Sequence, residues 1–187
     1  MRVAFAIIIL ATLLSYSCRS SRNTVKTATP AIEAQSAYQQ VDYYDPSTWL
    51  LGYISPGMFS NPPHSDWYVR GRADYSPDET VIGQLRKSIG NDLSILIVLG
   101  TWCPDSRREV PRFMKIVEET GFPVERMEFV GVDITKLAPV GGYDTLNIER
   151  VPTFIFLRNK VEAGRIIETP VTSLEQDMQN ILTRNEN

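Results

Sequence analysis

Six apolar residues stand almost without interruption between Leu93 and Leu99, and this run constrains the fold more than any other part of the chain. A run this short and this apolar is typical of a β-strand buried on both faces, as the central strands of parallel sheets are. A turn and a helical pattern follow the run directly, beginning at Thr101. The sequence therefore predicts an α/β fold in which a buried strand leads straight into a helix.

The remaining periodic segments also alternate between helix and strand. We expect helices over about 77–89, from the turn at 101–106 to Thr120, and from Leu174 onward, with strands over 127–132, 153–157 and 161–167. Ser76 to Glu79 reads as a capping box with Pro77 at the first helical position, and Pro111 predicts a kink in the second helix. This order predicts a central mixed sheet, parallel in its centre and antiparallel at one edge, with helices on both faces.

Cys103 lies in the turn between the buried strand and the second helix. Unpaired backbone N–H groups and the helix dipole favour a thiolate at a helix start, so Cys103 is a candidate nucleophile. Free cysteine is also among the most buried residue types, so the thiol could equally be a small buried hydrophobe. The position of Cys103 alone leaves these two interpretations balanced.

Charge and composition exclude several classes of function. The chain has 187 residues and a net charge of −3, and Arg107-Arg108 is its largest basic cluster, so we expect no nucleic-acid partner. His64 is the single histidine and lies in a Pro-rich stretch, where we expect it to be solvated. No cysteine pair has metal-ligand spacing, so we expect neither a metal nor another cofactor.

The first residues predict export. Arg2 and the apolar run from Val3 to Leu14 are typical of a signal peptide over 1–17, and the run is too short for a membrane span. Cys18 follows and resembles the lipid-bearing cysteine of bacterial lipoproteins, although Leu14 stands one position further from it than usual. We expect a lipoprotein anchored through Cys18 and facing the periplasm or cell envelope. The alternatives are a soluble exported protein, or cleavage elsewhere that removes Cys18 or leaves it free.

Two segments separate Cys18 from the first predicted helix. Residues 18–40 are rich in small and polar residues without periodicity, which predicts a flexible tether. Residues 41–76 are rich in aromatic residues and proline, and we expect this extension to pack on the flank of a domain spanning 41–187. An exposed aromatic groove for a partner is the less favoured alternative.

With these elements placed, residues 77–185 resemble the thioredoxin family. Trp102-Cys103 matches the family's Trp-Cys, Pro111 matches its helix-kink proline, and Val151-Pro152-Thr153 matches the segment with a cis proline. The resemblance implies a thioredoxin-like fold in which Pro152 faces Cys103 and leaves nearby backbone open to a bound peptide. Without the resemblance, Pro152 is an ordinary trans proline at the start of a strand.

Three departures from the family pattern narrow the chemistry. Ser106 replaces the second cysteine, and Ile97 replaces the buried carboxylate that serves as a proton shuttle, so the motif is Cys-x-x-Ser. Pro104-Asp105 replaces Gly-Pro, and Asp105 disfavours a thiolate whereas Arg107 and its neighbour favour one. Asp105 or Ser106 could also cap the helix.

These observations predict an envelope protein that performs single-thiol exchange at Cys103, with Trp102, Pro104, Asp105, Ser106 and Pro152 in supporting positions. Isomerisation and the handling of mixed disulfides or adducts need one thiol, so protein or small-molecule thiols and disulfides are the expected partners. The alternative is a redox-inactive thioredoxin-fold binding module for envelope proteins. Peroxide reduction by Cys103 is a less favoured hypothesis, because no further catalytic pattern surrounds the thiol. We expect a monomer that meets the membrane only through the lipid on Cys18.

Overall fold

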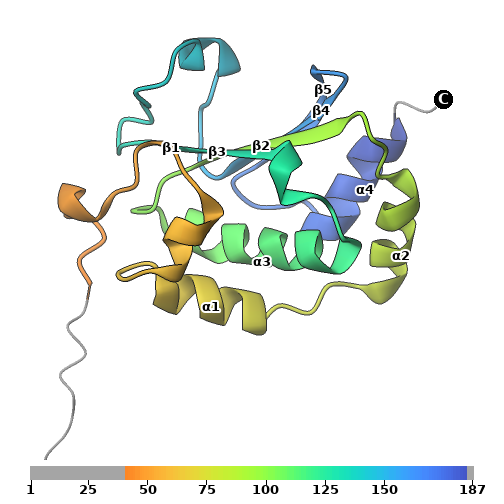
Figure 1. Cartoon of the computed structure of the whole chain (residues 1–187), viewed down its shortest axis with the longest axis horizontal. Coiled ribbons are helices and arrows are strands. Elements are labelled where there is room, and N and C mark those ends of the chain that lie inside the picture. Colours follow the sequence, from red (N-terminus) through yellow and green to blue (C-terminus); the bar gives the residue numbers. More distant parts are fainter. Residues whose placement is uncertain (1–40, 185–187) are drawn as a thin grey trace, which may run out of the picture. The chain divides into compact units, whose positions relative to one another are not determined.

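The computed structural model describes residues 41–184 (Figure 1). The predicted signal peptide over 1–17, the tether over 18–40 and Cys18 lie outside the described residues. The α-helices are α1 (Ser65–Ala73), α2 (Glu79–Ser88), α3 (Pro104–Thr120) and α4 (Leu174–Arg184), and the strands are β1 (Gly52–Tyr53), β2 (Leu93–Leu99), β3 (Met127–Gly131), β4 (Thr153–Arg158) and β5 (Val161–Ile167). Short 3-10 helices cover Pro46–Thr48, Pro56–Ser60, Val124–Arg126 and Tyr143–Leu146.

The five strands form one mixed sheet in the order β1-β3-β2-β4-β5. β2 and β3 run parallel, with Ile97 beside Phe129, and every other neighbouring pair is antiparallel. The α/β class and the mixed sheet agree with the sequence prediction. The prediction of a single antiparallel edge is wrong, because β1 comes from the aromatic extension and adds an antiparallel edge beside β3.

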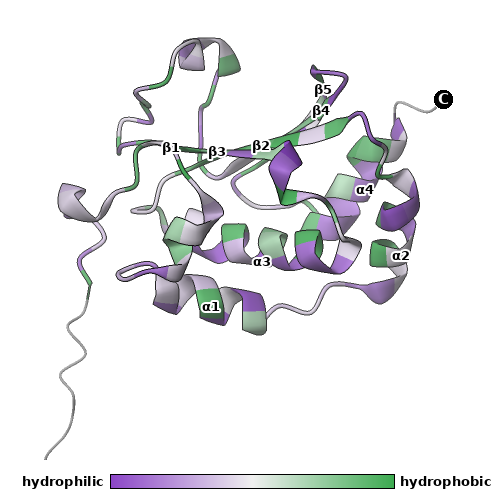
Figure 2. Cartoon of the chain, viewed as in Figure 1, coloured by the Kyte–Doolittle hydropathy of each residue, from purple (hydrophilic) through white to green (hydrophobic). Residues whose placement is uncertain are grey.

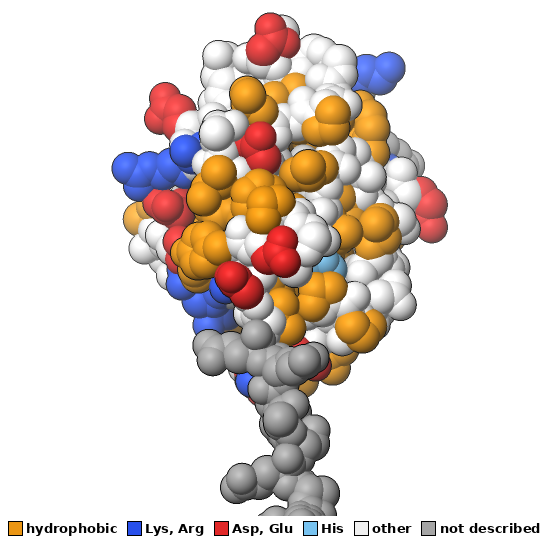
Figure 3. All heavy atoms as spheres, turned by 90° about the vertical axis from the view of Figure 1, so that its left-hand side faces the viewer, with side chains coloured by type: hydrophobic (Ala, Val, Ile, Leu, Met, Phe, Trp, Pro, Cys, Tyr) orange, Lys and Arg blue, Asp and Glu red, His pale blue; other side chains and the backbone are white. Residues whose placement is uncertain are grey.

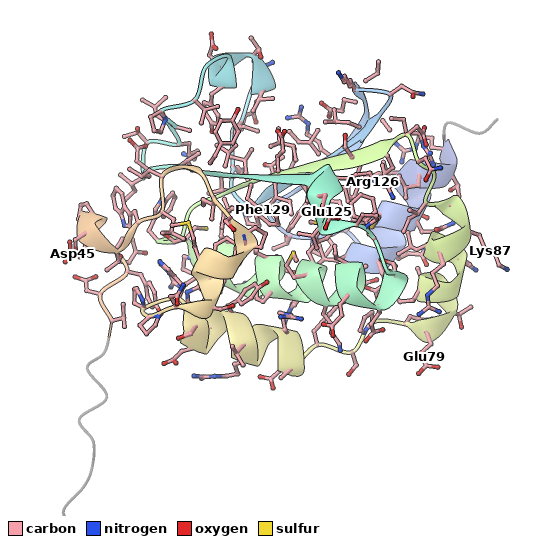
Figure 4. The ribbon with its side chains drawn as sticks, in the orientation of Figure 1. Asp45, Glu79, Lys87, Glu125, Arg126 and Phe129 are labelled. Carbon is pink, nitrogen blue, oxygen red and sulfur yellow. The ribbon has the colours of Figure 1, made fainter. Side chains whose placement is uncertain are left out.

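The main core lies between the sheet and a layer formed by all four α-helices (Figure 1). Alternate residues of β2, such as Ile95 and Ile97, belong to this core together with Phe113 of α3 and Met178 of α4. Phe129 projects from β3 into the same layer, whereas Glu79 and Lys87 of α2 point to solvent (Figure 4). Hydrophobic residues accordingly concentrate along β2 and on the sheet-facing sides of the helices (Figure 2).

The second face of the sheet has no α-helix within the described part of the chain. Leu96 and Val98 of β2 are covered there by residues of the segment 133–150, including Tyr143 in a four-residue 3-10 helix. The expectation of helices on both faces is therefore wrong. The segment between β3 and β4 is too rich in glycine and proline to continue a helix, so it covers the sheet as an irregular chain.

The aromatic extension 41–76 supplies β1 to the sheet and packs against α3. Phe59 is fully buried and its ring lies 5.3 Å from that of Tyr68 and 6.0 Å from that of Phe129. The extension also contains α1, which the sequence did not reveal. α1 lies along α3 (Figure 1), and Gly71 allows the close approach because a Cβ there would lie 2.5 Å from Pro111 Cγ.

The ends of α2 and α3 are fixed by different means. Asp78, rather than Ser76, caps α2, since its carboxylate accepts from the backbone N–H groups of Thr80 and Val81. The capping-box prediction was therefore wrong in register by two residues. α3 ends at Gly121, whose φ of 72° lies in the left-handed region that glycine adopts without strain.

Candidate functional site

Cys103 is the N-cap residue of α3 and connects the end of β2 to that helix. Its backbone is extended, with φ −79° and ψ 124°, and its N–H donates to the Gly100 carbonyl at 2.9 Å. No side chain caps this helix end, and Pro104 occupies the first helical position without an N–H to satisfy. The Cys103 side chain therefore stands at the positive end of the α3 dipole.

The Cys103 thiol donates a hydrogen bond to the Val151 carbonyl, with Sγ and O 3.3 Å apart. Cys103 is 6% exposed and packs with Val98 and Val132 in the apolar cluster on the second face of the sheet. That cluster is separate from the core that holds Phe59 of the aromatic extension. The apolar cluster around Cys103 therefore contains no residue of the aromatic extension. Among residues 41–184, Cys103 has no cysteine partner.

The Val151–Pro152 segment lies against Cys103 because β4, which follows it, is the neighbour of β2 in the sheet. The Val151–Pro152 peptide bond is cis, and both residues are buried. Thr153 begins β4 and its hydroxyl donates to the Arg150 carbonyl at 2.6 Å. The structure thus brings together Cys103 and Pro152, two of the predicted site residues that are distant in sequence.

Trp102 and Ser106 stabilise the turn that contains Cys103. The Trp102 indole N–H donates to the Val132 carbonyl at 2.9 Å, and its ring lies where a Cβ at Gly100 would be. Ser106 is fully buried, and its hydroxyl accepts a hydrogen bond from the Gly100 N–H at 3.2 Å. Ser106 therefore supports the turn rather than capping the helix.

Asp105 does not cap α3 either. Its carboxylate lies 2.7 Å from the Arg108 guanidinium in an i,i+3 pair, and Arg108 also contacts Glu109 at 2.6 Å. Glu109 and Asp105 each carry a negative charge, and both hydrogen bonds raise the pKa of Arg108. The negative charge that Asp105 places near the thiol is therefore compensated by a neighbour on the same helix.

Arg107 has a different environment from Arg108. Its Nη1 donates to the carbonyls of Thr101 and Trp102 at 3.0 and 2.7 Å, and its guanidinium lies 4.1 Å from the ring centre of Tyr43. Burial lowers the pKa of Arg107, while negative charge on Tyr43 or Cys103 would raise it. The sequence analysis gave Arg107 and Arg108 the same effect on the thiol and did not distinguish them, although the i+4 spacing of Arg107 from Cys103 was an available signal.

His64 is buried rather than solvated, which corrects the sequence prediction. It is 3% exposed, lies edge-on to Trp67, and its Nδ1 has no hydrogen-bond partner among the described residues. Burial and the nearby positive charge of Arg107 lower the pKa of His64. The prediction failed because neither the Pro-rich context nor any periodicity indicates that Trp67 and Tyr43 enclose this stretch.

Ile97 takes part in packing only and does not face Cys103. Ile97 is fully buried in the main core, on the face of β2 opposite to the one that packs with Cys103.

Within residues 41–184, no group of three or more His, Cys, Asp or Glu side chains could hold a metal ion. No helix in that range is long and apolar enough to cross a membrane.

The surface at the end of the domain that carries the 3-10 helix Pro46–Thr48 is rich in hydrophobic side chains (Figure 3). His64 contributes only a small area to this surface. Tyr44, Tyr53 and Leu137 are the most exposed hydrophobic residues in the segments that meet there, at 60%, 70% and 63%. Hydrophobic and acidic side chains lie next to one another on this surface (Figure 3).

Comparison with known proteins gives limited similarity. No family model and no curated protein matches the sequence. A protein of unknown function from Pseudomonas aeruginosa has 15% identity and a TM-score of 0.46, over 66% of this chain and 75% of that one. An HIV epitope-scaffold has 14% identity and a TM-score of 0.47, over 75% of this chain and 86% of that one. Similarities at this level carry no inference about function.

Proposed function

We propose that this chain is an exported thioredoxin-like protein in which Cys103 carries out single-thiol thiol–disulfide exchange, such as isomerisation or the handling of mixed disulfides and adducts. The position of the Cys103 sulfur supports this proposal most directly. The sulfur stands at an uncapped helix N-terminus and 3.3 Å from a backbone carbonyl next to a proline. Packing alone does not require a thiol at that place, because a small aliphatic side chain would fill the same cluster.

The exchange proceeds in two steps, formation of a mixed disulfide and its resolution. The Cys103 thiol releases its proton to solvent, and the thiolate attacks one sulfur of a substrate disulfide, forming a new S–S bond while the other sulfur leaves as a thiolate. A second thiolate, from the same substrate or from an external thiol, then attacks the mixed disulfide and releases Cys103. The buried Ser106 hydroxyl cannot perform this second step, so unaided reduction of a protein disulfide stops at the mixed disulfide.

Residues around Cys103 support the resemblance to the thioredoxin family, whereas the arrangement of helices around the sheet does not. Trp102, Cys103, Pro111 and Pro152 stand where the family motif has them, and the last of these follows the carbonyl that contacts the thiol. The absence of an α-helix on the second face of the sheet, within the described residues, departs from the expected layers. Export, a lipid on Cys18 and an envelope location remain predictions from the sequence.

A redox-inactive binding module is the second candidate, and the burial of Cys103 favours it. A thiol that is 6% exposed and packed among Val98, Val132 and Val151 has the environment of an inert core cysteine. The apolar surface around the turn would then bind envelope proteins without any chemistry. The two candidates differ in one measurable quantity, the reactivity of the folded thiol.

Alkylation of the full chain with Cys18→Ser tests the proposal, because Cys103 is then the one thiol among the chain's two cysteines that remains. We expect iodoacetamide at neutral pH to label the folded protein on the order of tenfold faster than the same protein unfolded in urea, since a stabilised thiolate reacts faster than an ordinary thiol. The Cys18→Ser/Cys103→Ser protein is the control for other labelling. Slower labelling in the folded state than in urea would support the binding module instead.

A further inference from the structure

The arginines at the start of α3 differ in whether a carboxylate neutralises them. Arg108 contacts Asp105 and Glu109, and Arg112 contacts Glu109 at 3.3 Å. For Arg107, by contrast, no carboxylate of residues 41–184 lies within salt-bridge distance, and the ionisable neighbours that affect it are two tyrosines and Cys103. Arg107 therefore supplies the net positive charge next to the thiol.

The charge of Arg107 is held in a fixed place. Its Nη1 is bound to the carbonyls of Thr101 and Trp102, the two residues that precede Cys103. One face of the guanidinium rests on Tyr43, whose hydroxyl donates to the Pro63 carbonyl at 2.9 Å. Within residues 41–184, Nε and Nη2 of Arg107 donate to no acceptor.

Other groups near Arg107 do not oppose this charge. His64, on the other side of Arg107, is buried and neutral, because a proton there would meet both burial and a like charge. Tyr43 is neutral at physiological pH, since burial raises its pKa. A guanidinium that is half-buried and uncompensated attracts anions more strongly than an exposed one does.

We propose that Arg107 is a specificity-determining residue, and that Cys103 reacts preferentially with disulfides of low-mass thiols that carry a carboxylate close to the sulfur. This inference rests on the proposed exchange at Cys103. In the reaction, the Cys103 thiolate attacks the disulfide sulfur that is close to the carboxylate; a new S–S bond to Cys103 forms, the original S–S bond breaks, and the other sulfur leaves as a thiolate. The substrate must be small, because only 6% of the Cys103 surface is exposed and its sulfur lies beside the Val151 carbonyl.

Three symmetrical disulfides of matched size test the proposal on the full chain with Cys18→Ser. Bis(carboxyethyl), bis(aminoethyl) and bis(hydroxyethyl) disulfide carry negative, positive and no charge, and intact-mass spectrometry follows adduct formation on Cys103. Each rate is divided by the rate for the same reagent with the protein unfolded in urea. We expect the normalised rate for the carboxylate to exceed that for the amine by on the order of tenfold, and the ratio to fall with added salt.

Variants assign the preference to Arg107. Arg107→Gln should bring the carboxylate-to-amine ratio close to one, and Arg107→Lys should keep most of it. Arg112→Gln is the matched control, because it removes one positive charge from the same helix further from Cys103, and it should leave the ratio unchanged. Equal ratios in the native chain and Arg107→Gln would overturn the proposal, as would a native ratio that salt does not change, even if the variant fails to fold.

The same experiment separates this inference from the proposed function. If the neutral bis(hydroxyethyl) disulfide reacts no faster with the folded chain than with the unfolded chain, the exchange function fails. If the neutral reagent reacts rapidly but the charged reagents do so equally, the exchange function stands and the role of Arg107 is refuted.

Discussion

Replacing Gly71 in α1 or Gly83 in α2 by alanine tests how closely α1 packs against α3. A Cβ at Gly71 would lie 2.5 Å from Cγ and 3.0 Å from Cβ of Pro111, whereas a Cβ at Gly83 in α2 would meet nothing within 4 Å. Both replacements by alanine gain the same helix propensity, about 0.5–1 kcal/mol. Only the first adds a steric overlap.

The overlap at Gly71 cannot be relieved by a side-chain rotation. Pro111 is a rigid ring in the buried part of α3, so either α1 or α3 must move. Overpacking of this kind costs about 1–3 kcal/mol, which exceeds the propensity gain. We therefore expect Gly71→Ala to lower the free energy of unfolding by about 1–2 kcal/mol, and Gly83→Ala to raise it by about 0.5–1 kcal/mol.

Urea denaturation followed by circular dichroism measures both variants. With an m-value of about 2 kcal/mol/M, the midpoint for Gly71→Ala should fall by roughly 0.5–1 M, and that for Gly83→Ala should rise by less than this. A Gly71→Ala protein that is as stable as Gly83→Ala would show that α1 does not approach Pro111 so closely. The packing of the aromatic extension on α3 would then be wrong.

Three further changes have defined outcomes. Asp78→Ala removes the α2 cap and should lower the free energy of unfolding by about 1 kcal/mol in urea denaturation. Ser106→Ala leaves the buried N–H of Gly100 without its acceptor, so we expect a loss of about 1–3 kcal/mol and altered alkylation kinetics at the turn. Because the pKa of His64 is lowered by burial and by Arg107, the unfolded chain binds the proton more tightly. Stability should therefore fall as pH drops below the unfolded value of about 6.5, and His64→Gln should remove this part of the pH dependence in parallel denaturation series.

The sequence predicted best those elements whose signals are local. The hairpin of β4 and β5 was placed within a residue, since β4 is largely apolar, β5 begins and ends with β-branched residues, and the turn between them contains Asn159, which readily adopts its φ of 50°. The run that became β2 was equally clear. In these segments the residues that determine the structure are adjacent to one another in the chain.

The elements that the sequence missed depend on distant contacts. α1 contains Gly71 and an exposed Val69, and no apolar stripe marks it as a helix. It is helical because its Tyr68 side packs into the core beside Phe59. The two residues of β1 are defined by pairing with β3, which is far away in sequence. Local propensity could not reveal either element, because tertiary packing decides both.

The site was predictable to the extent that a motif or a helical spacing marks it. Cys103 and Pro152 were found through their motif, and the i,i+3 spacing of Asp105 and Arg108 on a helix that starts at Pro104 could have indicated their ion pair. The difference between Arg107 and Arg108 could not be seen, since it depends on Tyr43 of the extension and on the carbonyls of the turn.

Ser106 has a structural role in the turn that contains Cys103. Its hydroxyl accepts from Gly100, whose lack of a side chain makes room for the Trp102 ring, and Trp102 in turn is bound to the Val132 carbonyl. A thiol at this position is a weaker acceptor, so cysteine would hold the turn less firmly. Serine at 106 therefore fixes the turn that contains Cys103. Under the proposed exchange function, the same serine offers no resolving thiol, so a mixed disulfide at Cys103 needs another thiol for its release.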